Sequence, residues 1–190
     1  MKSKLITVII LSFLYNGYSQ QTDNSVNKHL LKGNLLFFPS LVYELGVTKS
    51  SAFKAEIGTS LTLFERFNET KIGVFPKLET QYKFYYNLNK RADKNRLING
   101  NSANFIALVG IYQGEEDLIG DSERVSKFLF LGPAWGLQRT YKSGFSFLVE
   151  LGFGYDFGYK EGNDNNGRPF PIIGLELGWI LFKTKKFNNE

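Results

Sequence analysis

The stretch GFSFLVELGFGYDFGY, residues 144 to 159, decides the fold class of this chain. Large apolar side chains occupy all of its odd positions: Phe145, Phe147, Val149, Leu151, Phe153, Tyr155, Phe157 and Tyr159. Its even positions are small or charged, with the single exception of Leu148. Because successive side chains of a strand point to opposite faces, this period of two predicts a β-strand with one apolar face and one small, polar face.

The length of this stretch favours a membrane. It has sixteen residues, whereas a strand of a globular protein usually has about 5–6. A tilted strand crosses a bilayer with about 9–11 residues and can extend beyond it on both sides. The stretch is therefore typical of one strand of an outer-membrane barrel.

Six further segments show the same alternation and are predicted strands: residues 30–45, 53–63, 72–88, 102–114, 126–139 and 169–183. Polar turn segments separate them, which predicts consecutive antiparallel hairpins and no parallel α/β units. Seven is an odd number, whereas single-chain bacterial barrels have an even one. We therefore expect an all-β, antiparallel, up-and-down transmembrane barrel of eight strands. The additional strand is predicted over about residues 22–31, with a turn at residues 32–34.

The composition of the two faces indicates which one lies outside. The polar face consists of Gly, Ala and Ser with single charges between them, and small residues fit the interior of a narrow barrel. The apolar face carries aromatic residues toward the strand ends, as the girdles of membrane barrels do: Tyr43, Tyr86, Tyr155, Tyr159 and Trp179. The alternative is a soluble, lipocalin-like barrel, in which the apolar face lines the interior.

The N-terminus has the three parts of a secretory signal. Lys2 and Lys4 precede an apolar run over residues 5–15, and Gly17 and Ser19 form a small-residue cleavage site. The expected organisation is a signal peptide (1–19), a flexible lead-in (20–29), a β-barrel domain (30–183) and a polar C-terminal tail (184–190). No later segment has the roughly 18 consecutive apolar residues of a spanning helix.

Composition excludes several classes of function. The 190 residues carry a net charge of +5, which falls to +3 without the two lysines of the signal peptide. The basic residues are spread along the chain, so no nucleic-acid partner is expected. The absence of cysteine excludes disulfides, thiolate metal sites and a cysteine nucleophile. The single histidine, His29, precedes the predicted barrel domain without a nearby nucleophile, and no metal or cofactor motif is present. We therefore predict no enzyme activity, no catalytic or metal-binding residues and no cofactor.

Charged residues on the small, polar faces are predicted to form a structural network inside the barrel: Lys54, Glu56, Lys77, Glu79, Lys83, Glu150 and Glu176. A hairpin that turns at residues 163–164 would place Glu150 opposite residues 176–177, so that the Glu150 and Glu176 carboxylates lie close together. Such pairs occur in interior ion networks. The alternative is a proton shared between the two acids.

Several short motifs resemble those of small outer-membrane β-barrel proteins of Gram-negative bacteria. They are the Tyr43-Glu44-Leu45-Gly46 strand end, the stretch YYNLNKR at residues 85–91, and the aromatic last strand, and the resemblance covers roughly residues 30–183. It implies residence in outer-membrane lipid and insertion by the outer-membrane assembly machinery, which recognises an aromatic final strand. Here a lysine-rich tail follows that strand.

The expected function is that of a non-enzymatic barrel with a side-chain-filled interior, in envelope structure or surface interaction. Eight strands enclose room for side chains or one small ligand only. The alternatives are a narrow channel, a binder of a small hydrophobic molecule, and a soluble periplasmic carrier.

Overall fold

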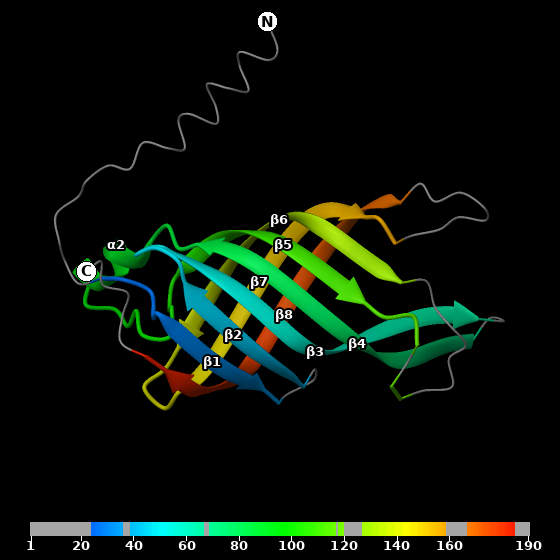
Figure 1. The fold of residues 1–190 in the computed structure, drawn as a ribbon, viewed down its shortest axis with the longest axis horizontal. Helices are drawn as coiled ribbons and strands as arrows, with labels where there is room; N and C mark the ends of the chain where they lie inside the picture. Colours follow the sequence, from blue (N-terminus) through cyan, green and yellow to red (C-terminus); the bar gives the residue numbers. More distant parts are fainter. Residues whose placement is uncertain are drawn as a thin grey trace, which may run out of the picture.

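The computed structural model describes residues 24–35, 39–66, 69–116, 118–119, 127–158 and 167–184, without the side chains of 62–72. These ranges contain eight strands and one helix, which are β1 (His29–Asn34), β2 (Ser40–Gly46), β3 (Ser51–Arg66), β4 (Glu69–Phe84), α2 (Leu88–Asp93), β5 (Asn104–Gln113), β6 (Phe128–Thr140), β7 (Phe145–Asp156) and β8 (Arg168–Lys183). Each strand pairs antiparallel with the next, and β8 pairs with β1, so that one sheet closes in a ring (Figure 1). No helix in the described ranges is long and apolar enough to cross a membrane.

The prediction of eight strands is confirmed, but the position of the additional strand was wrong. Residues 30–45 are not one strand: they divide into β1 and β2. Lys32, Gly33 and Asn34, the predicted turn, are the last three residues of β1. Asn34 pairs with Ser40, so the chain reverses between these two residues, where Pro39 is the single turn signal in an otherwise apolar stretch. The prediction failed because an apolar turn reads as a continuation of the strand.

The described part of the lead-in packs against the closed sheet. Ser25, Val26 and Asn27 are buried, and the Val26 amide donates to the Lys49 carbonyl oxygen at 3.0 Å. His29 does not precede the sheet: it is the first residue of β1. The predicted signal peptide (1–19), the tail after Thr184 and Tyr159 lie outside the described residues.

The strands are steeply tilted. Paired residues lead once around the ring from Ile180 through Lys32, Val42, Glu56, Glu79, Ile111, Phe130 and Asp156 to Arg168. The circuit returns to β8 twelve residues away from its start. Because a closed sheet links strand tilt to this displacement, the strands run obliquely around a narrow interior (Figure 1).

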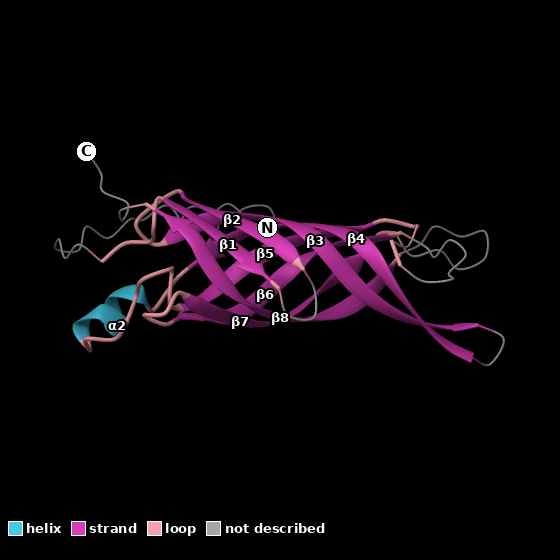
Figure 2. Ribbon diagram, turned by 90° about the horizontal axis from the view of Figure 1, so that it is seen from below, coloured by secondary structure: helices cyan, strands magenta, loops and turns pink. Residues whose placement is uncertain are grey.

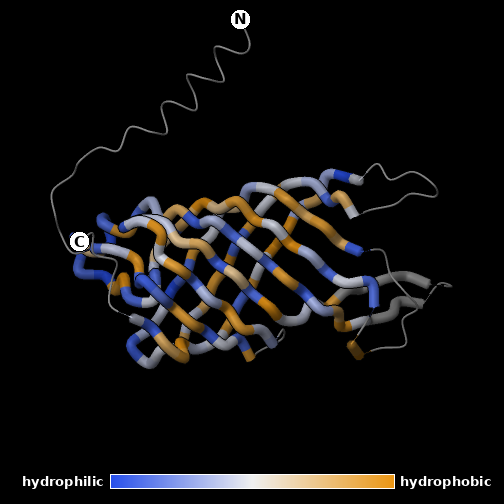
Figure 3. Tube along the Cα trace, viewed as in Figure 1, coloured by the Kyte–Doolittle hydropathy of each residue, from blue (hydrophilic) through white to orange (hydrophobic). Residues whose placement is uncertain are grey.

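The apolar face of the strands lies outside and the small, polar face inside. In β7, Leu151 and Phe153 are 52% and 62% exposed, whereas Leu148 is 1% and Glu150 3% exposed. Hydrophobic and hydrophilic residues alternate along the other strands as well (Figure 3). The alternation is weaker in residues 102–114, because Phe105, Ala107 and Val109 of β5 are apolar residues that point inward.

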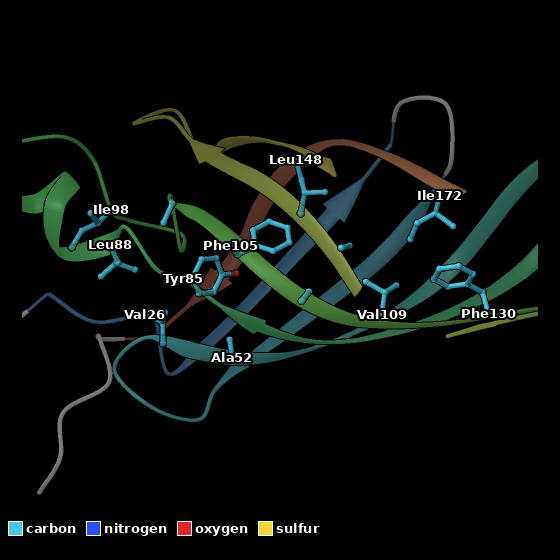
Figure 4. Packing of buried hydrophobic residues seen from close by; sticks show 13 residues of the cluster. Val26, Ala52, Tyr85, Leu88, Ile98, Phe105, Val109, Phe130, Leu148 and Ile172 are labelled. Atoms are coloured by element: carbon cyan, nitrogen blue, oxygen red, sulfur yellow. The ribbon is translucent and has the colours of Figure 1, made fainter. Parts of the chain in front are cut away.

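One end of the ring is closed by its own chain. We call the end that carries α2 and the turns at residues 47–50 and 141–144 the closed end. α2 was not predicted, because six residues are too few for a helical period to be read. Figure 4 shows Tyr85 and Phe105 side by side in the interior, with Leu88 and Ile98 next to the helix. The Tyr85 and Phe105 rings meet edge to face, 5.7 Å apart, so an apolar layer fills this end.

The wall has uneven height at the opposite end. β3 and β4 extend beyond the other strands as a projecting arm, far from α2 (Figure 2). β2 pairs with β3 only as far as Gly58, and β1 pairs with β8 only from Gly178 onward. Among the described residues, positions 59–66 of β3 therefore have no partner strand on the β2 side. Positions 168–177 of β8 likewise have none on the β1 side.

Candidate functional site

The Lys54 ammonium is the centre of the interior charge network. Its Nζ lies 2.6 Å from Glu56 Oε2, 2.6 Å from Glu79 Oε1 and 2.5 Å from Glu176 Oε1. The four residues come from β3, β4 and β8. They meet because the even-numbered positions of β3 and β8 and the odd-numbered positions of β4 point inward. Lys54 is fully excluded from solvent, so these ion pairs supply the charge compensation that water cannot.

A second lysine completes this group. Lys77 Nζ lies 3.1 Å from Glu56 Oε1 and 3.0 Å from Glu79 Oε2. Glu79 thus binds Lys54 through one carboxylate oxygen and Lys77 through the other. This arrangement makes Glu79 a bridge between the two lysines.

Glu150 lies beside the group with a different environment. Its two carboxylate oxygens accept hydrogen bonds from Gln81 Nε2, at 3.1 and 3.0 Å. The same nitrogen also donates to Glu79 Oε1 at 2.7 Å. Within the described part of the chain, no lysine, arginine or histidine nitrogen lies within 4.0 Å of the Glu150 carboxylate. Glu150 is therefore a buried acid whose described partner is a neutral amide.

A second cluster, nearer the closed end, surrounds Glu44. Lys32 Nζ lies 2.9 Å and Lys83 Nζ 3.4 Å from Glu44 Oε1. Glu44 Oε2 accepts hydrogen bonds from Tyr85 Oη at 2.9 Å and from Asn101 Nδ2 at 2.8 Å. Burial and the adjacent Glu44 carboxylate raise the pKa of Tyr85 well above its usual range, so its hydroxyl remains a donor.

The structure places all seven predicted network residues inside the ring and divides them between the two clusters. Lys83 belongs to the cluster around Glu44; the other six lie around Lys54. The sequence prediction omitted Lys32 and Glu44. Both occupy even positions of the same alternation, which is the signal that could have identified them; Lys32 was placed in a turn instead.

The predicted register of the last hairpin, with Glu150 opposite residues 176–177, was wrong by two to three residues. Glu150 pairs with Gly174, and Glu176 pairs with Leu148. A Cβ atom at position 174 would lie 2.6 Å from Glu150 Cγ. Gly174 therefore provides the space that the Glu150 side chain occupies, and this register places the bulky acid against the residue without a side chain.

Three acids of the network have the spacing of a metal site. The carboxylate oxygens of Glu56, Glu79 and Glu176 lie within 4.8 Å of one another. The Lys54 ammonium makes an ion pair with each of them, so a cation already occupies the point where they converge. This geometry favours an internal salt bridge over a metal centre.

His29 lies at the edge of the sheet, away from both clusters. Its Nδ1 is 2.6 Å from Tyr43 Oη, and its backbone amide donates to Thr184 Oγ1 at 2.9 Å. These contacts tie β1 to β2 and to the residue after β8, which indicates a structural position.

A cavity of about 260 Å³ lies in the half of the interior away from the closed end. Lys77, Glu79, Glu150 and Gln113 contribute polar groups to its wall. Phe128, Phe170 and Ile172 are among its apolar residues. The cavity is thus lined by charged and polar groups together with aromatic and aliphatic side chains, which is the general composition of a site for a small molecule.

A scan against protein-family profiles found no match to this chain, and searches of curated proteins and of solved structures likewise found none.

Proposed function

We propose that this protein is a small integral outer-membrane β-barrel with a polar interior closed by its own side chains. Its role is structural or interactive at the bacterial cell envelope, and it is not an enzyme. The observation that carries the proposal is the inverted polarity of the closed sheet, with ionised side chains inside and large apolar side chains outside.

The buried charges support the proposal because charged residues are almost never fully buried in proteins unless they are paired. Here Lys54, Lys83 and Glu44 are each 0% exposed. The surrounding ion pairs and hydrogen bonds compensate their charges. A soluble carrier of lipophilic ligands has the opposite arrangement, with an apolar interior.

The exterior half points to lipid. Outward apolar residues of four strands, β3, β5, β7 and β8, are more than half exposed: Ile57 at 65%, Leu108 at 54%, Leu151 at 52%, Ile173 at 81% and Leu181 at 61%. Soluble monomers rarely expose apolar patches larger than about a few hundred Å². Exposure of such a surface to water is unfavourable. In a membrane the outward side chains contact acyl chains instead of water, so this unfavourable exposure does not arise.

Aromatic residues near the closed end fit a membrane interface. Tyr43, Tyr86 and Trp179 are exposed at this end of the ring. The Trp135 indole N–H donates to the Tyr86 hydroxyl at 2.8 Å. Rings with an apolar body and a polar edge gather at the headgroup level of membranes. We therefore infer that one membrane surface lies at this level.

The interior argues against a channel as the main function. The Lys54 and Glu44 clusters connect strands across the ring, and the apolar layer around Tyr85 and Phe105 fills the closed end. Water and ions would have to break buried ion pairs to pass. We expect no steady conductance from the folded protein.

Membrane fractionation tests the proposal. After lysis and a carbonate wash, the protein should remain in the outer-membrane fraction, and the unheated sample should migrate differently from the boiled one on a denaturing gel. Recovery in the soluble periplasmic fraction would favour the carrier alternative. In planar bilayers the purified protein should give no ohmic current, and a steady, ion-selective current would favour the channel alternative.

A further inference from the structure

In the described part of the chain, the wall of the ring has an opening beyond the ends of the short strands β1 and β2 that lie away from the closed end. Between positions 59–66 of β3 and 168–177 of β8, no described strand completes the sheet. The cavity reaches this place, and its lining includes side chains of both faces. Glu79 and Glu150 face inward at 4% and 3% exposure, whereas Leu61 and Ile173 face outward at 46% and 81%. One cavity can contact both faces only where it passes through the wall.

The edge of β8 at this opening is built to remain unpaired. Pro169 and Pro171 have no backbone N–H, and strand prolines are found where no neighbour needs that donor. Residues two apart direct their backbone nitrogens to the same edge. Both prolines pair with β7 on the other side, opposite Tyr155 and Phe153. The Ile180 amide donates to the Gly144 carbonyl oxygen on the β7 side, so the odd positions 169 and 171 direct their nitrogens to the open side. The missing donors therefore lower the cost of an unpaired edge.

On the β3 side the first unpaired residue finds a substitute partner. The Thr59 amide donates to the Pro39 carbonyl oxygen at 3.1 Å, beyond the last residue pair between β2 and β3. The opening thus has a defined rim. It forms a side entrance to the cavity at the level where outward residues are apolar.

The described interior contains one more glutamate than lysine, and Glu150 is the glutamate without a lysine partner. Among the described residues, four lysines (Lys32, Lys54, Lys77, Lys83) and five glutamates (Glu44, Glu56, Glu79, Glu150, Glu176) have buried or half-buried side chains inside the ring. Every one of these glutamates except Glu150 has a lysine Nζ within 3.4 Å. Glu150 lines the cavity, so a cationic group of a ligand has space beside it.

Apolar side chains lie next to this carboxylate. The Phe128 and Phe170 rings meet edge to face with centroids 5.2 Å apart, and Ile172 lines the same cavity. A ligand with a short hydrocarbon chain would contact these residues while its charged end reaches Glu150. A purely polar cation would leave the aromatic side unfilled.

We propose that this cavity binds a small amphiphile with a single ammonium group, which enters sideways through the opening between β3 and β8. The ammonium pairs with Glu150, and the hydrocarbon part lies against Phe128, Phe170 and Ile172. Binding depends on the cavity alone, whereas entry from lipid rests on the proposed membrane location. The competing account is a Glu150 that holds a proton and binds no ligand.

Titration calorimetry on the purified protein in a non-ionic detergent tests the site, with hexylammonium as the probe and hexanol and hexanoate as its neutral and anionic counterparts. Hexylammonium should bind at one site per chain. The affinity of both counterparts should be lower by about tenfold or more. Glu150→Gln, which keeps the shape and removes the charge, should weaken hexylammonium binding by about tenfold or more. Glu115→Gln, an exposed acid outside the cavity, should bind like the wild type.

Two results would overturn the site: no saturable hexylammonium binding, or equal binding by the wild type and Glu150→Gln. Heat-dependent gel migration confirms that each variant is folded. If the protein fractionates as soluble, the same titration in plain buffer still tests the cavity, so failure of the site and failure of the membrane proposal remain distinguishable.

The side entrance has its own experiment, because the chain contains no cysteine. A bulky thiol reagent on Leu61→Cys, at the rim of the opening, should abolish hexylammonium binding. The same reagent on Leu78→Cys, an exposed outward position that does not line this cavity, should leave binding unchanged. Unchanged binding by the modified Leu61→Cys variant would overturn the side entrance.

Discussion

Lys54 and Glu176 form an ion pair of 2.5 Å across 122 residues of sequence. They lie on β3 and β8, which are not neighbours in the sheet, because β1 and β2 lie between them. The pair therefore spans the interior and holds together the two sides of the wall opening. Glu176 lies on the part of β8 that no described strand covers on this side, so side chains connect it to β3.

Replacement of Lys54 should destabilise the protein strongly. Lys54→Met leaves Glu56, Glu79 and Glu176 with fewer positive partners in a buried site, and removal of one member of a buried ion group costs about 3–5 kcal/mol. Urea unfolding in detergent measures the loss. Lys142→Met, at an exposed turn position, should change the free energy of unfolding by less than about 0.5 kcal/mol. Equal stability of the two variants would refute the ion cluster as a stabilising element.

A charge on the outer face of β7 should impair membrane folding. Leu151→Arg puts a guanidinium where we expect the middle of the bilayer, at a cost of about 2–4 kcal/mol. The fraction folded into lipid vesicles, read from heat-dependent migration, should fall. Val47→Arg introduces the same side chain at an exposed turn position of the closed end and should fold like the wild type. If both variants fold equally well, the outer face does not contact hydrocarbon.

The Tyr85 hydroxyl should contribute to the stability of the closed end. Tyr85→Phe keeps the contact with the Phe105 ring but removes the hydrogen bond to Glu44. A hydrogen bond to a charged group contributes about 1.5–3 kcal/mol. Tyr141→Phe, at a 52% exposed position, is the matched control and should be nearly neutral. The comparison is made by denaturant unfolding, and a neutral Tyr85→Phe would show that Glu44 is sufficiently solvated by its other partners.

The closed end should face the periplasm, since short turns of outer-membrane barrels usually lie there. Lys94→Cys, next to α2, and Glu115→Cys, at the opposite end, introduce single thiols into a chain without cysteine. A membrane-impermeant maleimide added to intact cells should label Glu115→Cys only. Labelling of both should appear after the outer membrane is permeabilised. Labelling of Lys94→Cys in intact cells would reverse the orientation.

The sequence allowed prediction of the sheet and its faces because alternation is a local property. Residues such as Leu151 and Glu150 are assigned to opposite faces by position alone. The same alternation made it impossible to recognise from the sequence that residues 30–45 form two strands, β1 and β2. Asn34 and Ser40 are paired and both point inward, so the turn between them preserves the even–odd pattern and the two strands read as one.

Features that depend on contacts between distant strands could not be predicted in this way. The partner of Lys83 is Glu44 rather than an acid of the Lys54 group, which depends on the tilt and register of the whole ring. The opening between β3 and β8 arises from the shortness of two other strands. The alternation of a single strand contains no information about the height of its neighbours.

The meeting of the two ends of the described chain has a consequence for connectivity. Thr184 donates its amide hydrogen to the His29 carbonyl oxygen at 2.9 Å, and Asn27 Nδ2 donates to the Thr184 carbonyl oxygen at 2.8 Å. A short peptide could therefore join these residues while the chain is cut in the turn at residues 47–50. Such a circular permutant would retain every strand pair, with β3 as its first strand and β2 as its last. The architecture thus belongs to the ring of pairings and not to the order in which the strands are synthesised.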